Sequence, residues 1–187
     1  MIVLSQQDPR WAARRLGDKG AHIESTIGRY GCAITCLAML LDGLLGMYDP
    51  IRVQDELLIH KGYRDGNLVN WPALPGIYRS LGHRGRFDCP DRAASSWEMM
   101  QVSSRLRKSQ AVILWVDARR DPSATPEFRA APKFKQHFVI AHSIDRKGMW
   151  IINDPWHGDS VPVCPRYGRT IEQALCGAIL FDVKATV

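Results

Sequence analysis

The chain has 187 residues, of which 45% are hydrophobic and 24% are charged, and its 15 glycines and 11 prolines are scattered along the sequence. This composition is typical of a globular domain with its own core, and it excludes collagen-like, low-complexity and disordered classes. We therefore expect a single domain over residues 1–187.

The net charge of +6 comes from 25 basic and 19 acidic residues, and the basic residues form short clusters spread over the whole chain. Because they form no stripe with aromatic residues, we expect a solvated surface and no specific nucleic-acid partner. Attraction to an anionic partner such as a bacterial cell wall is the alternative.

The sequence contains no apolar run near the roughly 20 residues of a membrane span. The N-terminal segment turns polar at Ser5, which is not the pattern of a signal peptide. We expect no membrane partner and a cytoplasmic location as synthesised. Delivery to a cell wall would need a separate system.

The predicted helices occupy the first part of the chain. Apolar residues recur with helical spacing over Cys32–Leu45 and cover so much of the circumference that this helix is expected to be central. Further helices are predicted over Ile51–His60, Trp71–Leu81 and Ser95–Lys108, the last of them capped by a serine at its start.

The predicted strands follow the helices. Short runs rich in Val, Ile and aromatic residues predict strands over Ala111–Val116, Phe138–Ile144, Met149–Asn153 and Ala178–Val183. A short polar link joins the second and third of these runs and predicts a tight hairpin.

Helices first and an antiparallel sheet afterwards is an α+β plan, in which the central helix packs on a C-terminal antiparallel sheet. The segment Arg119–Lys135 is too long for a plain turn, and we expect it to border a functional site.

The five cysteines are an odd number at irregular spacings, which disfavours a disulfide framework. A zinc site is also disfavoured, because no second Cys or His pair has zinc-finger spacing. His137 and His142 are five residues apart in a predicted strand, so they point to opposite faces. We expect no metal and no other cofactor.

Gly31 and Cys32 open the predicted central helix. There the unsatisfied backbone N–H groups and the positive end of the helix dipole stabilise a thiolate, which is the reactive form of cysteine. We expect Gly31 to leave room for a substrate. Cys32 is therefore the candidate nucleophile.

A nucleophilic cysteine needs a base, and the candidate is His137, at the start of an apolar strand; His142 and His157 are secondary candidates. The base needs an orienting group, and Asp154 ends the next strand of the predicted hairpin, with Asn153 as the alternative. Antiparallel neighbours joined by a short turn bring His137 and Asp154 to one sheet edge. An oxyanion would be bound by the Cys32 backbone N–H and by the side-chain amide of Gln6.

Four motifs in order resemble the papain-fold cysteine peptidases related to the bacteriocin-processing, double-glycine leader peptidase domains. They are Ser5–Trp11, Thr26–Thr35, Gln136–Ile140 and Asn153–Gly158, and the resemblance covers about residues 4–168. It is to the stand-alone bacterial or phage members of that family. The order Cys, His, Asp also fits transglutaminase-like and NlpC-type enzymes, but the upstream Gln favours the double-glycine peptidase relatives.

The resemblance implies a papain-like fold with Cys32 as a helix-borne nucleophile, His137 as a strand-borne base, Asp154 as the orienting group and Gln6 in the oxyanion hole. Gln7 occupies the neighbouring position and ranks second. The sequence thus predicts a cysteine peptidase that cleaves a peptide bond through an acyl-enzyme. Two alternatives are a peptidoglycan endopeptidase or amidase with the same triad, and a catalytically silent binding module. The expected partner is accordingly a peptide or peptidoglycan.

Overall fold

The computed structural model describes residues 1–118 and 137–183, which form two compact units. The first unit contains Met1–Gly85, Pro155–Asp159 and the chain from Phe181 onward, and the second contains Arg86–Asp154 and Ser160–Leu180. The single domain stays a prediction. The segment Arg119–Lys135, which we expect to border a site, lies outside the described residues.

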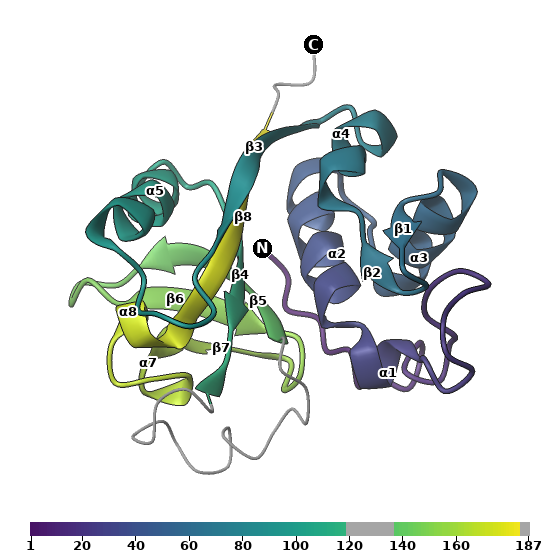
Figure 1. The fold of residues 1–187 in the computed structure, drawn as a ribbon, viewed down its shortest axis with the longest axis horizontal. Coiled ribbons are helices and arrows are strands. Elements are labelled where there is room, and N and C mark those ends of the chain that lie inside the picture. Colours follow the sequence, from purple (N-terminus) through teal and green to yellow (C-terminus); the bar gives the residue numbers. More distant parts are fainter. Residues whose placement is uncertain (119–136, 184–187) are drawn as a thin grey trace. The chain divides into compact units, whose positions relative to one another are not determined.

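The first unit is mainly helical (Figure 1). Its elements are α1 (Ile27–Tyr30), α2 (Cys32–Leu45), α3 (Pro50–Ile59), the short strands β1 (Tyr63–Arg64) and β2 (Leu68–Val69), the 3-10 turn η1 (Trp71–Ala73) and α4 (Leu74–Ile77). The side chains of Thr26 and Asp49 cap α1 and α3 by accepting a backbone N–H from the first turn.

Helix α2 forms the core of the first unit. Residues 32–45 are the helix that the sequence predicts, and nine of its 14 side chains are buried, among them Ile34, Leu37 and Leu41. Burial of this order is the largest favourable contribution to folding, about 25 cal/mol per Å² of apolar surface. The helix ends at Gly46, whose φ of 71° suits glycine.

The second unit is built on a sheet with strand order β3-β8-β4-β5-β6-β7, in which β4–β5, β4–β8 and β5–β6 are antiparallel pairs. The elements are β3 (Leu81–Asp88), α5 (Ser96–Arg107), β4 (Val112–Val116), β5 (His137–Ile144), β6 (Trp150–Asp154), β7 (Asp159–Pro162), α7 (Val163–Arg166), α8 (Ile171–Ala174) and β8 (Leu175–Val183). Strands β3, β7 and β8 each have residues in both units. The mixture of helix and antiparallel sheet agrees with the predicted α+β class.

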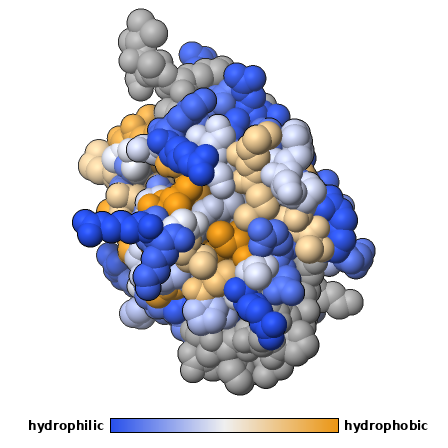
Figure 2. Space-filling model, turned by 90° about the vertical axis from the view of Figure 1, so that its left-hand side faces the viewer, coloured by the Kyte–Doolittle hydropathy of each residue, from blue (hydrophilic) through white to orange (hydrophobic). Residues whose placement is uncertain are grey.

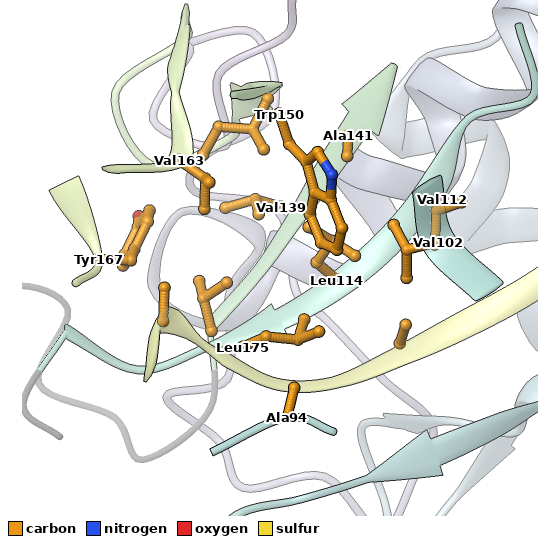
Figure 3. Packing of buried hydrophobic residues seen from close by; sticks show 14 of the residues in the cluster. Ala94, Val102, Val112, Leu114, Val139, Ala141, Trp150, Val163, Tyr167 and Leu175 are labelled. Carbon is orange, nitrogen blue, oxygen red and sulfur yellow. The ribbon is translucent and has the colours of Figure 1, made fainter. Parts of the chain in front are cut away.

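The core of the second unit gathers buried side chains from β4, β5, β6 and α5 (Figure 3). Trp150 is 1% exposed and packs with residues such as Leu114 and Val139, and Tyr167 lies at one side of the same cluster. The capping box of Ser95 and Glu98 fixes the start of α5, as the predicted serine cap requires.

Two parts of the sequence-based fold are wrong. The predicted helix over Trp71–Leu81 is only η1 and α4, because proline is tolerated only in the first turn of a helix, and Pro72 and Pro75 each lie in the first turn of a separate short helix. Tyr78 is already extended, and Leu81 begins β3. Strands β3 and β7 were not predicted; they are the outer strands of the sheet, and their polar sequences lack an apolar alternation.

No single helix among the described residues is long and apolar enough to cross a membrane. Helices α2 and α3 together have the length and apolar composition of a membrane span, but the pair is bent by 97° at the break between the two helices. On the face shown in Figure 2, hydrophobic residues lie between hydrophilic residues whose side chains protrude.

Candidate functional site

Cys32 is the first residue of α2, directly after the N-terminal cap Gly31. Its side chain is buried, with 9% of the residue exposed, and it is a free thiol. A backbone N–H in the first turn of a helix has no carbonyl one turn earlier to bond, so it can serve an anion. The sequence-predicted position of Cys32 at a helix start is confirmed.

The structure corrects the expected role of Gly31. A Cβ atom at this position would lie 2.4 Å from the carbonyl oxygen of Ile27 and 2.7 Å from its Cγ2. Glycine is therefore required because α1 packs against the chain here, and the space is filled by Ile27 instead of being left open for a substrate.

Gln6 and Gln7 donate their side-chain amides to the same acceptor, the carbonyl oxygen of Gly28, over 2.9 and 2.6 Å. Gln6 is 1% exposed, whereas Gln7 lies at the surface. The backbone N–H of Gln6 also donates to the carbonyl of Pro155 over 2.7 Å. Gln6 is thus held in the first unit by Gly28, a residue of α1, the helix that precedes α2 in the chain.

The Gln6 amide is only partly used by these contacts. A primary amide has two N–H donors, and one of them binds Gly28. Among the described residues, the Gln6 Oε1 atom is buried without a hydrogen-bond partner. A buried polar group left in this state is costly and calls for an explanation beyond packing.

His137 and Asp154 meet in the second unit, as the predicted hairpin requires. His137 begins β5, Asp154 ends β6, and the His137 Nε2 atom lies 2.9 Å from Asp154 Oδ1. Only 3% of His137 and none of Asp154 is exposed. Burial strengthens this contact, because a charge-assisted hydrogen bond is worth more in a low-dielectric interior than in water.

The carboxylate of Asp154 has two further donors. The phenol of Tyr167 donates to Oδ2 over 2.6 Å, and Arg166 Nη1 lies 3.0 Å from the same oxygen. Arg166 ends α7 and Tyr167 follows it, so adjacent residues of one segment hold one oxygen of the carboxylate. The sequence analysis did not identify Arg166 or Tyr167, because neither residue lies in one of the four motifs or at a spacing that predicts contact with Asp154.

The other candidates take different places. Asn153 is buried beside Asp154, but the carboxylate that pairs with His137 belongs to Asp154. His157 is exposed. His142 Nε2 lies 3.3 Å from Ser160 Oγ, and burial lowers the pKa of His142.

The cysteines and potential metal ligands add no second centre. All five cysteines are buried, and none of them is in a disulfide bond. Among residues 1–118 and 137–183, no three His, Cys, Asp or Glu side chains are grouped so that they could hold a metal ion.

The predicted residues therefore form two half-sites, one in each unit. We call Gln6 and Cys32 the first half-site, and His137 and Asp154 the second half-site.

Comparison with protein-family models finds no match, and neither does comparison with curated protein sequences. A solved structure is similar: the crystal structure of a candidate C39-like peptidase from Bacillus anthracis, with a TM-score of 0.48 and 14% sequence identity. The match covers 98% of this chain and 100% of that chain. Likeness at this level assigns neither a family nor an activity to the protein.

Proposed function

We propose that the protein is a cysteine peptidase-like hydrolase that cleaves peptide or amide bonds through an acyl-enzyme on Cys32. The observation that carries the proposal is the buried hydrogen bond of 2.9 Å between His137 Nε2 and Asp154 Oδ1. A histidine oriented by a carboxylate is the base that an activated thiol needs. Cys32 at the start of α2 is the matching nucleophile.

The hydrogen bond to Asp154 also identifies the reactive nitrogen of His137. A carboxylate only accepts, so the ring proton sits on Nε2 and Nδ1 is the nitrogen that takes a proton. In the proposed reaction the Cys32 thiol gives its proton to Nδ1, and the sulfur attacks the carbonyl carbon of the scissile bond.

The remaining steps of the proposed reaction use the proton that His137 Nδ1 has taken from Cys32. The tetrahedral intermediate carries an oxyanion, for which the Cys32 backbone N–H and the second N–H of the Gln6 amide are the donors. As the C–N bond breaks, Nδ1 returns its proton to the leaving amine, and the acyl group stays on sulfur. Water then attacks the thioester with His137 as base, which releases the acid and restores the thiol.

The mechanism requires the two half-sites to act on one substrate. The papain-like fold and the relation to double-glycine leader peptidases belong to the same proposal, and they rest on the four motifs and on the two half-sites.

The proposal is tested by incubating the protein with a peptide library and, separately, with purified peptidoglycan, and analysing products by mass spectrometry. We expect cleavage by the wild-type protein and by Cys36→Ala, a matched control one turn further along α2, and none by Cys32→Ala. The substrate that is cleaved distinguishes a peptidase from a peptidoglycan hydrolase. Equal cleavage by Cys32→Ala would overturn the mechanism, and absence of cleavage by the wild-type protein in both assays would favour the binding module.

A further inference from the structure

Among the described residues, the side chains of His137, Tyr167 and Arg166 contact the carboxylate of Asp154, which is more than orienting a histidine needs. Oδ1 accepts from His137, while Oδ2 accepts from both Tyr167 and Arg166. Asp154 is fully buried, Tyr167 is 1% exposed and the Arg166 side chain is 10% exposed. A buried carboxylate is costly unless it is paired and hydrogen-bonded, and here both conditions are met by neighbouring residues.

We propose that Arg166 and Tyr167 are positioning residues that set how tightly His137 holds its proton. This inference rests on the proposed function, because it takes His137 to be the catalytic base. The residues whose contacts support it all lie within the second unit. The two residues hold Asp154 as a carboxylate and turn Oδ1 toward the ring. The Arg166 charge also offsets the charge of Asp154, so the carboxylate favours an imidazolium less than it would alone.

This balance matters for both halves of the reaction. A carboxylate beside an imidazole makes it a stronger base, which helps it take the thiol proton. A base that holds the proton too tightly is a poor acid toward the leaving amine, and catalysis is best when proton affinity is intermediate. Arg166 sets an upper limit on that affinity, and Tyr167 keeps the carboxylate from rotating away.

The described polar contacts of His137 and Asp154 come from two segments. Asp154 reaches His137 from β6, and Arg166 and Tyr167 approach from the segment of α7. On β4 the register partner of His137 is Val116, which does not titrate, and Asp117 follows it in the chain. The Tyr167 ring also lies beside the imidazole, with centroids 5.8 Å apart.

The test is an NMR titration of the His137 ring in histidine-labelled full-length protein, with the signal assigned from a His137→Asn sample. For Arg166→Gln we expect the midpoint to rise by about one pH unit, and for Tyr167→Phe by about half a unit, because each change leaves the carboxylate charge less compensated. Arg166→Lys should restore most of the wild-type midpoint. Arg107→Gln and Tyr63→Phe are matched controls in other parts of the molecule, and neither should move it.

A purely structural role predicts a different result. Arg166→Gln and Tyr167→Phe would then lower the melting temperature while the His137 midpoint stayed at the wild-type value, which would overturn the inference. If Arg166→Gln does not fold, Tyr167→Phe carries the test, since it removes one oxygen and keeps the ring. The midpoint is measured without any substrate, so the inference can fail or hold independently of the hydrolase activity.

Discussion

Cys32 begins an α-helix in the first unit, whereas His137 begins a β-strand in the second. The position of Cys32 is set by the backbone: the cap at Gly31, the close packing of Ile27 against that glycine and the buried length of α2. His137 is set by side chains, through Asp154 and the two donors behind it. Changes of backbone should therefore displace Cys32, whereas changes of polar side chains should displace His137.

The largest effect is expected for Asp154→Asn in the second half-site. Asparagine can present its amide N–H to the ring and so select the wrong tautomer, and we expect hydrolysis to fall by about 10³–10⁴-fold. The measurement is the rate of cleavage of whichever substrate the wild-type protein accepts. Asp145→Asn is the matched control, because Asp145 binds backbone N–H groups in the turn of the same hairpin. Equal losses for the two variants would mean that Asp154 serves stability alone.

A smaller loss is expected for Gln6→Ala in the first half-site. Removal of one oxyanion donor costs about 10²–10³ in rate, and the effect should fall on kcat. Gln7→Ala removes a hydrogen bond to the same Gly28 carbonyl from an exposed side chain. We expect Gln7→Ala to keep nearly full activity, and a larger loss for Gln7→Ala than for Gln6→Ala would reverse the assignment.

The backbone dependence of the first half-site can be measured through two glycines of the α2 region. Gly31→Ala forces a Cβ onto Ile27 and should lower the free energy of unfolding by about 1–3 kcal/mol. Gly43→Ala places a methyl group in open space inside the helix, with only Met1 Cε at 3.9 Å, and should raise that free energy by up to about 1 kcal/mol. Urea unfolding compares the two variants, and a neutral Gly31→Ala would contradict the packing described at the start of α2.

The smallest effect concerns Glu98, which is in the second unit but outside its half-site. The Arg92 guanidinium, with help from Ser95, lowers the pKa of Glu98 from 4.5 to about 2. A lowered pKa in the folded state means that the stabilisation is present above pH 4.5 and is lost as the pH falls toward 2. Since half of Arg92 is exposed, solvent screens the pair, and we expect Glu98→Gln to cost only about 1 kcal/mol at neutral pH.

This prediction is checked by urea unfolding of wild-type and Glu98→Gln protein from pH 7 to pH 2. The difference between them should shrink as the pH is lowered, and the His137 titration should be the same in both. A constant difference over the whole range would show that the ion pair is not its source.

Local patterns were enough to predict the elements that carry the candidate site. The apolar spacing of residues 32–45 predicts α2, and the hairpin of β5 and β6 brings His137 to Asp154 because a short turn leaves few alternatives. The sequence could not predict the outer strands β3 and β7, which are polar. Pro75, by contrast, is a signal in the sequence that the predicted helix over Trp71–Leu81 is interrupted. The contacts of Arg166 and Tyr167 with Asp154 could not be predicted either. Hydrogen bonds between side chains more than ten residues apart leave no periodic pattern in the sequence.

The central claim is that the thiol of Cys32 and the imidazole of His137 act as a pair. The most direct test is the pH dependence of Cys32 alkylation by iodoacetamide, followed by mass spectrometry, in wild-type protein and in His137→Ala. We predict that iodoacetamide labels Cys32 faster than the other four cysteines at pH 6 in the wild-type protein, and that His137→Ala slows this labelling, because the thiol has then lost its base. Superimposable profiles for the two proteins, or faster labelling of another cysteine at pH 6, would contradict the account.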